Sequence, residues 1–526
     1  MDCTLRDGGY VNHWNFSKKQ ARDTIVGLIG AGIDIIECGF LDATYSCSQW
    51  STRFSNLEMI DELFVGIEKK DTLIVAMIEY GKFDIDTLPN FVCEKSVIGG
   101  IRFSFRRSDW KNSLEGMRKI VKKRYRLFVQ PITTNSYPKE ELQEMLSRVR
   151  ELEPFAVYIV DTQGSMYEKD VSCLFEDFDR ILQKTTAIGF HSHNNMQLSY
   201  ANAIGFVSQQ TDRELIVDAS IYGMGRGAGN LNTELFATFL NQKQQKQYDT
   251  NILWNLIDTY YHAMHIMYGW GYSIFHYLSA SIGCHPDYAS YLLDKKHLLV
   301  EDIKKILEKI PKEYSYEFNK TIIEDLYFSS NVHHNEKNRE PFLGDQQRIV
   351  LIGSGKSVQK DLGQFAQENT ILIALNHIPK ELKVDYVFFN SIKRFIALSE
   401  KEMSGIKKIF SSNLGDIATR DDYVLNYQEL VEVDEKTRSD NSVIMLLNYL
   451  QKQGFSTVDL AGIDGFEIDS QENYCYEELD RVVDKNALKD INDDIKKCLD
   501  ILSKKIKVNF LTKSIFESKN TEGRSQ

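Results

Sequence analysis

Two short stretches of this 526-residue chain contain side chains that could together hold a metal ion. Arg6 and Asp7 lie in TLRDGG, and His191 and His193 lie in HSHNN (191–195). In an extended strand, residues two apart point to the same side, so both imidazoles can face one point. With the Asp7 carboxylate they make a two-histidine, one-carboxylate ligand set that leaves positions open for substrate and water. The fold must bring the two stretches together for this set to form.

A third stretch, SIYGMGRGAGNLNTE (220–234), is dense in glycine and allows two interpretations. Its backbone amides could cradle a phosphate group. Alternatively, the glycines form a tight loop that brings the amide oxygen of Asn230 to the metal as a fourth ligand, which is a reasonable role for a hard oxygen donor. The sequence leaves both open.

The elements that would position these residues alternate in type along the chain. Helix-patterned segments such as 17–32 and 139–153 separate eight short apolar runs. The runs are 2–5, 33–40, 72–80, 99–105, 126–132, 155–161, 186–193 and 215–221. Eight strands alternating with helices over roughly 240 residues predict a (β/α)8 TIM barrel. An open doubly wound sheet is disfavoured because no glycine fingerprint follows the first run.

Catalytic side chains of a barrel come from the carboxyl ends of its strands. By that rule Arg6 and Asp7 end the first strand, and His191 and His193 end the seventh. The strands between them contribute further candidates for binding substrate. These are Glu37, Arg102, Gln130 and Thr162.

Composition and charge exclude several classes of protein. The formal net charge is -12, which argues against a nucleic-acid or anionic-membrane binder. No apolar run approaches the ~20 residues of a membrane span, and the N-terminus lacks a signal-peptide pattern. The eight cysteines are scattered without a CxxC pair, so we expect free thiols in the cytoplasm and no structural zinc or disulfide framework.

The pattern of elements also predicts the domain organisation. The barrel is expected over 1–245, and a helical, aromatic-rich extension over 246–330. A polar, nonperiodic linker is expected over 331–346. A second α/β, Rossmann-like domain is expected over 347–526, where apolar runs recur from 348–358 to 507–512 and 439–454 reads as a helix.

DCTLRDGG, HSHNN and GRGAGN (225–230), together with IIECGF and DTQGSM (161–166), resemble the DRE-TIM metallolyase superfamily. Its members include HMG-CoA lyase, isopropylmalate synthase and 4-hydroxy-2-oxovalerate aldolase. The resemblance covers roughly residues 1–290. It implies Mn²⁺ or Mg²⁺ held by Asp7, His191 and His193, with Asn230 completing the set. It also implies that a C–C bond is made or cleaved through the metal-bound enolate of a 2-oxo acid, with Arg6 beside the enolate oxygen.

The resemblance implies pyruvate and an aldehyde as substrates and, by analogy, a homo-oligomer. One departure concerns the acid/base group. The oxovalerate aldolases have a histidine three residues after the metal-binding aspartate, and this chain has Tyr10 there. Tyr10 would serve only with a lowered pKa or through a relay. The segment GWGYSIFHYLSASIGCHPDYA resembles the region after the barrel in aldolase-like members, and Tyr288 in it is a candidate substrate contact, with His285 also of interest.

The second domain has its own resemblance. IVLIGSGKSV, ILIALN, DYVFFN and VDLAGIDGF are similar to bacterial sialyltransferase-like Rossmann-type domains, which implies that a nucleotide sugar is contacted by Gly353, Ser354, Gly355 and Asn376. No histidine follows His377 to serve as a transferase base, which favours nucleotide binding or a structural role.

Three functions therefore follow from the sequence. The first is a metal-dependent aldolase or lyase, acting in surface-carbohydrate metabolism. The second is a Claisen-type synthase that joins acyl-CoA to a 2-oxo acid. The third is a glycosyltransferase-related protein with the barrel as scaffold.

Overall fold

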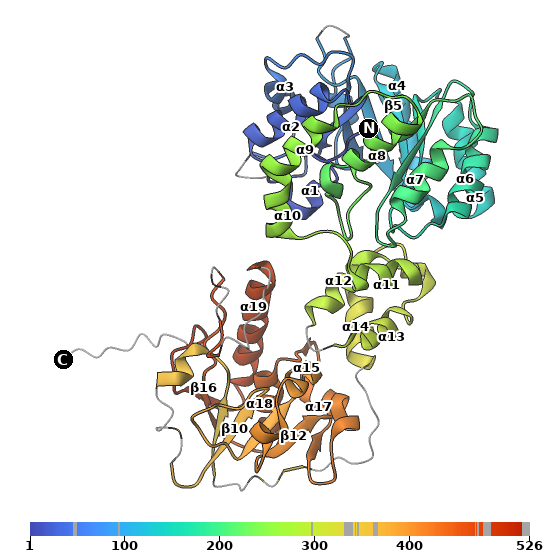
Figure 1. Cartoon of the computed structure of the whole chain (residues 1–526). Coiled ribbons are helices and arrows are strands. Elements are labelled where there is room, and N and C mark those ends of the chain that lie inside the picture. Colours follow the sequence, from blue (N-terminus) through green and yellow to red (C-terminus); the bar gives the residue numbers. More distant parts are fainter. Residues whose placement is uncertain are drawn as a thin grey trace. The chain divides into compact units, whose positions relative to one another are not determined.

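In the computed structural model, the chain forms two compact units, each built around its own sheet (Figure 1). The first unit comprises Met1–Ser290 and Pro311–Phe318, and the second comprises Tyr291–Ile310 and Asn319–Gln526. The structure describes residues 1–45, 50–92, 95–295, 298–330, 340–341, 343, 347–360, 365, 367–468, 470, 473–476 and 485–517. The helices predicted as a barrel extension are thus shared between the units, and most of the predicted linker lies outside the described residues.

The first unit contains a curled, parallel, eight-stranded sheet with strand order β2-β1-β3-β4-β5-β6-β7-β8. Its strands are β1 (Ile35–Leu41), β2 (Arg53–Phe54), β3 (Leu73–Glu79), β4 (Gly100–Phe105), β5 (Arg126–Pro131), β6 (Ala156–Asp161), β7 (Ala187–Ser192) and β8 (Leu215–Val217). Seven of the predicted runs each overlap one of these strands, and the predicted TIM-barrel class is confirmed. The two-residue β2 was not predicted.

The remaining predicted strand, residues 2–5, is wrong as a regular strand. Only Asp2 pairs, as an isolated bridge to Ile36 on one side and Ala219 on the other. The backbone nevertheless closes the barrel, because Asp2 N donates to Ile35 O at 2.9 Å and Cys3 N donates to Ala219 O at 2.8 Å. The chain then turns at once, which places Arg6 and Asp7 at the carboxyl end of the barrel.

The short helix α1 (Gly9–Asn12) follows Asp7 and carries Tyr10, which lines the cavity at the carboxyl end of the barrel. Helices cover the outside of the sheet. They are α2 (Lys18–Gly30), α3 (Leu57–Phe64), α4 (Trp110–Lys122), α5 (Lys139–Arg150), α6 (Glu168–Ile181), α7 (Ser199–Val207) and α8 (Thr233–Lys243). Helix α2 begins where the Ser17 side chain accepts from Gln20 N, and it buries Ile25, Leu28 and Ile29 toward the barrel. A large apolar core lies between sheet and helices, and a smaller one that includes Phe128 and Tyr158 forms a separate cluster of strand residues.

The segment after α8 is helical, as predicted. It contains α9 (Thr250–Leu256), α10 (His262–Tyr268), α11 (Ile274–Ile282), α12 (Pro286–Asp294), α13 (Val300–Leu307) and α14 (Lys320–Ser330). None of the helices in the described part of the chain is long and apolar enough to cross a membrane.

The second unit has a parallel seven-stranded sheet with order β13-β12-β11-β10-β9-β16-β17. The strands of this unit are β9 (Arg348–Ile352), β10 (Thr370–Leu375), β11 (Tyr386–Phe389), β12 (Lys407–Ser411), β13 (Tyr423–Leu425), β14 (Glu432–Asp434), β15 (Thr437–Arg438), β16 (Thr457–Ala461) and β17 (Lys507–Phe510). The helices after α14 are α15 (Ile392–Ile396), α16 (Glu400–Met403), α17 (Tyr427–Val431), α18 (Ser442–Lys452) and α19 (Lys485–Leu502). A second α/β domain was expected here; β13 and the β14–β15 pair were not.

Candidate metal centre and cavity

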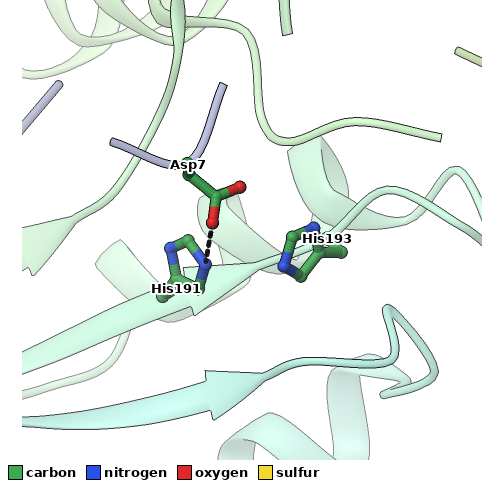
Figure 2. A group of neighbouring side chains, drawn as sticks. All are labelled: Asp7, His191 and His193. Carbon is green, nitrogen blue, oxygen red and sulfur yellow. Dashed lines mark ion pairs between the residues drawn. The ribbon is translucent and has the colours of Figure 1, made fainter. Parts of the chain in front are cut away.

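Asp7, His191 and His193 meet at the carboxyl end of the barrel (Figure 2). One ligand atom from each lies within 4.8 Å of the others, and all three residues are buried. His191 Nε2 is 3.9 Å from Asp7 Oδ1. The centres of the His191 and His193 rings are 5.3 Å apart, and the ring planes make an angle of 87°. The fold therefore brings together the three residues that the sequence predicted as a ligand set.

The turn that carries Asp7 is held by packing on Trp14. Trp14 Nε1 donates to the carbonyl of Arg6 at 2.8 Å. Gly8 and Gly9 have ordinary helical conformations, and a Cβ on Gly9 would lie 2.1 Å from Trp14 Cδ1. These glycines are thus needed for close approach rather than for an unusual backbone conformation.

Asp7 is ionised and His193 is neutral, for different reasons. Burial alone would raise the pKa of Asp7, but Arg6 and the two imidazoles outweigh it and hold that pKa well below its usual range. Burial lowers the pKa of His193 to about 4, with the Asp7 charge opposing the shift. A carboxylate and a neutral imidazole are the forms in which these side chains bind metal.

A chain of buried ion pairs connects the two sides of this cluster. Arg6 Nε and Arg102 Nη1 each donate to Glu37 Oε2 at 2.7 Å. Arg102 also pairs with Asp218, and Asp218 Oδ2 lies 3.0 Å from His191 Nδ1, a close contact without the geometry of a directed hydrogen bond. Carboxylates at the second nitrogen of a ligand histidine orient the ring in metal sites, and we propose that Asp218 orients His191 in this way.

This network corrects two predicted roles. Glu37 and Arg102 were expected to bind substrate, but their side chains are fully buried in ion pairs, and neither is among the described residues that line the cavity. Their charges are used within the protein to hold Arg6 and Asp218.

Asn230 is brought to the cluster by the glycine-rich loop. Its Nδ2 donates to Asp7 Oδ2 at 2.7 Å. A Cβ on Gly229 would lie 2.1 Å from the carbonyl of Gly223, so the loop needs glycine to fold back this tightly. This geometry favours the tight-loop interpretation, although the amide presents nitrogen rather than oxygen to Asp7.

The donor atoms fit a divalent cation. Among the described residues, His193 Nδ1 and Asn230 Oδ1 are buried without a hydrogen-bond partner. Buried polar atoms normally have partners, so such atoms beside an Asp–His–His cluster suit a site that is completed by an ion and its ligands.

A cavity of about 480 Å³ opens beside the cluster. Arg6, Asp7 and both histidines line it, together with Gln130 and Thr162, which the sequence predicted as substrate-binding residues. Thr162 Oγ1 accepts from Thr133 N at 2.8 Å, whereas Gln130 Nε2 is a buried donor without a partner among the described residues. Thus Gln130 has a donor available for a ligand.

Tyr10 and Tyr288, the other two predicted residues, differ in position. Tyr10 lines the cavity with 40% of its surface exposed. Desolvation raises its pKa, and Asp7 acts in the same direction, so the lowered pKa is absent and the relay is the predicted route that is left for Tyr10. Tyr288 is buried among the helices, where its hydroxyl lies 2.9 Å from the carbonyls of both Tyr314 and Glu317. Its predicted substrate contact is therefore not supported.

The second unit has a cavity of about 190 Å³ lined by Gly353, Ser354, Gly355 and Asn376, the predicted nucleotide-binding residues. It lies at the carboxyl ends of β9 and β16, where the strand order reverses. However, the N–H groups of Gly353 and Gly355 donate to the carbonyls of Ala461 and Gly462, each at 2.8 Å. These two amides hold the neighbouring loop and are not available to a phosphate.

Two residues at or beside the site were not predicted from the sequence. Asp218 follows β8, and an acidic residue directly after an apolar run was the available signal. Arg226 lines the cavity from within GRGAGN, where its charge was the available signal. His285, which the sequence marked as of interest, also lines the cavity and comes from the segment after the barrel.

The curled eight-stranded sheet, with one carboxylate and two imidazoles gathered at its carboxyl end, defines a barrel domain with a candidate divalent-metal centre. Residues 1–259 match the HMGL-like family model. The resemblance predicted from the motifs is thereby confirmed.

Relatives are distant. A 4-hydroxy-2-oxovalerate aldolase of Thermomicrobium roseum is 28% identical over 46% of this chain and 66% of that protein. A 4-hydroxy-2-oxovalerate aldolase of Chloroflexus aurantiacus is 26% identical over 46% of this chain and 68% of that protein. The chain thus spans about two thirds of the length of these curated relatives. Among solved structures, the N-terminal domain of a putative aldolase from Bacteroides vulgatus is 22% identical, with a TM-score of 0.47, over 56% of this chain and 95% of that one.

Proposed function

We propose that the first unit is a divalent-metal-dependent aldolase or lyase that makes or cleaves a C–C bond next to a 2-oxo acid. The observation that carries this proposal is the convergence of Asp7, His191 and His193 beside Arg6 in one cavity. The match to the HMGL-like family model and the relatives named 4-hydroxy-2-oxovalerate aldolase support it. Pyruvate and an aldehyde are the proposed substrates.

Asp7, His191 and His193 would hold Mn²⁺ or Mg²⁺. When bound, such an ion polarises a carbonyl oxygen and stabilises the negative charge that develops there. Arg6 lines the cavity next to Asp7, and its position is fixed by Glu37. Its planar, permanently charged guanidinium is suited to the oxygen of an enolate.

A proton-exchange experiment tests this proposal. The protein is loaded with Mn²⁺, its metal content is measured, and pyruvate is added in D₂O. We expect the methyl protons to exchange for deuterium with loaded protein and to be retained after chelation. Absence of exchange in a metal-containing preparation would refute enolate chemistry. Thiol release from acetyl-CoA with a panel of 2-oxo acids would instead indicate the Claisen-type synthase.

A second candidate function concerns the second unit. We propose that its cavity binds a nucleotide or nucleotide sugar, because the cavity lies where the strand order reverses, which is where ligands of open α/β sheets bind. Arg394 and Tyr474 also line it, with the Arg394 guanidinium 5.1 Å from the Tyr474 ring centre. Calorimetric titration with CMP, UDP and their sugar conjugates tests this, and no heat with any of them would refute it. A homo-oligomer, a cytoplasmic location and a role in surface-carbohydrate metabolism stay predictions.

A further inference from the structure

Trp270 lies in the aromatic segment GWGYSIF, two residues beyond the end of α10, and the proposed function has given it no role. Helix α10 fixes its position. His265 Nε2 donates to the carbonyl of Trp270 at 2.9 Å. The centres of the His265 and Trp270 rings are 4.7 Å apart, and the ring planes make an angle of 84°. The indole is thus held by the helix that precedes it.

The Trp270 indole contacts both ends of the glycine-rich loop that carries Arg226 and Asn230. Its Nε1 donates to the carbonyl of Tyr222 at 2.8 Å. At the other end, a Cβ on Gly229 would lie 3.3 Å from Trp270 Cδ1, so the indole packs directly on that glycine. One side chain from the segment after the barrel therefore spans the base of this loop.

Tyr222 has a backbone conformation that needs such support. Its φ and ψ angles are 56° and 23°, in the left-handed region that residues other than glycine seldom adopt. Such conformations persist where surrounding contacts enforce them. The N–H of Tyr222 donates to Glu234 Oε2 at 3.0 Å, and its carbonyl accepts from Trp270. Glu234 is buried, and Asn232 Nδ2 donates to its other oxygen at 3.0 Å. Side chains thus hold both backbone polar groups of Tyr222.

The turn at Tyr222 sets the position of Asn230. The carbonyl of the next residue, Gly223, accepts from Asn230 N at 3.0 Å. The Asn230 side chain in turn donates to Asp7 Oδ2 at 2.7 Å. Trp270 itself is not among the described residues that line the cavity. Any effect of Trp270 on the metal cluster must therefore pass through the backbone of the loop.

Trp270 also packs against the apolar core of the first unit. That contact uses the apolar surface of the ring, whereas the described hydrogen bond of the indole N–H is the one to Tyr222. Replacing Trp270 by phenylalanine removes the N–H and keeps an aromatic ring. The two uses of the side chain can therefore be separated by experiment.

We propose that Trp270 is a positioning residue for the metal cluster, an inference that rests on the metal-dependent function proposed above. Trp270 and Glu234 hold Tyr222 in its left-handed conformation. This conformation keeps the loop folded back, and the folded loop holds the Asn230 amide against Asp7. Without the indole N–H, the Tyr222 peptide can leave this conformation, and Asn230 then moves away from Asp7.

The test compares Trp270→Phe with Trp254→Phe in the full-length protein. Trp254 is a matched control because it lies in α9 of the same unit and is 51% exposed. Calorimetry gives the Mn²⁺ dissociation constant, and circular dichroism gives the thermal midpoint. Hydrogen exchange followed by mass spectrometry gives the deuterium uptake of residues 221–230 and of α4 in the metal-free protein.

For Trp270→Phe we expect the Mn²⁺ dissociation constant to rise by about 3–10-fold, the range that the loss of one hydrogen bond supplies. Uptake by residues 221–230 should become faster by a similar factor, because the loop opens more often. Uptake by α4 should stay as in wild type. Trp254→Phe should match wild type in both the Mn²⁺ dissociation constant and the uptake.

A double-mutant cycle with Asn230→Ala separates positioning from a purely structural role. If Trp270 acts through Asn230, the double variant should bind Mn²⁺ as weakly as Asn230→Ala alone, within about twofold. Losses of affinity that multiply would overturn the proposal. An unchanged Mn²⁺ affinity in either single variant would also overturn it, and so would faster uptake throughout the first unit.

The wild-type protein distinguishes these failures from a failure of the proposed function. A wild-type protein that binds Mn²⁺ but does not exchange pyruvate protons refutes the aldolase function and leaves the role of Trp270 standing. A wild-type protein that binds no Mn²⁺ refutes the metal centre and the role of Trp270 together.

Discussion

Asp218→Asn is the substitution that best tests the buried charge network. The Asp218 and Arg102 side chains are both fully buried and paired, and Asp218 Oδ2 lies 3.0 Å from His191 Nδ1. Asparagine keeps the size of the side chain and removes its charge. The change leaves Arg102 with Glu37 as its described carboxylate partner and deprives His191 of the group that orients its ring.

Two magnitudes follow from this geometry. Removing one partner of a buried ion pair lowers the free energy of unfolding by about 3–5 kcal/mol. For a unit of this size that corresponds to a fall of roughly 6–10 °C in the thermal midpoint. Loss of the carboxylate behind a ligand histidine lowers metal affinity by about 10–100-fold.

Thermal unfolding followed by tryptophan fluorescence and Mn²⁺ titration by calorimetry measure the two effects separately. Asp179→Asn is the matched control, because Asp179 Oδ1 accepts from Arg213 Nε at 2.5 Å and neither residue is in the metal cluster or its ion-pair chain. It should lose stability while keeping its Mn²⁺ affinity. If Asp218→Asn bound Mn²⁺ as tightly as wild type, the proposed orientation of His191 by Asp218 would be refuted.

Three further predictions concern other sites. Arg6→Lys keeps the charge but loses the planar donors that reach both Asp7 and Glu37. Exchange of pyruvate protons should therefore slow by about 10²–10³-fold, while the affinity for pyruvate changes much less. A loss of pyruvate affinity without slower exchange would contradict this. Gly9→Ala places a Cβ against Trp14 and should lower the thermal midpoint of the first unit, with an unchanged midpoint counting against the close approach. In the second unit, burial lowers the pKa of His377 to about 4. The unfolded chain therefore takes up the proton first, and the free energy of unfolding should fall by about 3 kcal/mol from pH 7 to pH 4. His377→Asn should remove this dependence in calorimetric scans.

The sequence was sufficient for the repeating architecture and for the three metal-cluster residues. Apolar runs long enough for buried parallel strands alternate with amphipathic segments, and both patterns depend on local residue order. The spacing of His191 and His193 fixes their common side because alternate residues of a strand face the same way. Asp7 could be added to this set because the carboxyl ends of all the strands of a TIM barrel lie at the same end of the barrel.

What each charged residue does was decided by tertiary structure alone. Glu37 and Arg102 lie on barrel strands, as expected. Because buried charges must be paired, Glu37 binds Arg6 and Arg102, and Arg102 also binds Asp218. Both side chains are thus engaged within the protein. Likewise, the sequence could not distinguish Tyr288 from His285, three residues away. The first turns its hydroxyl to backbone carbonyls and the second lines the cavity. Which side of a helix start faces a cavity depends on packing against distant segments, and local sequence does not contain that information.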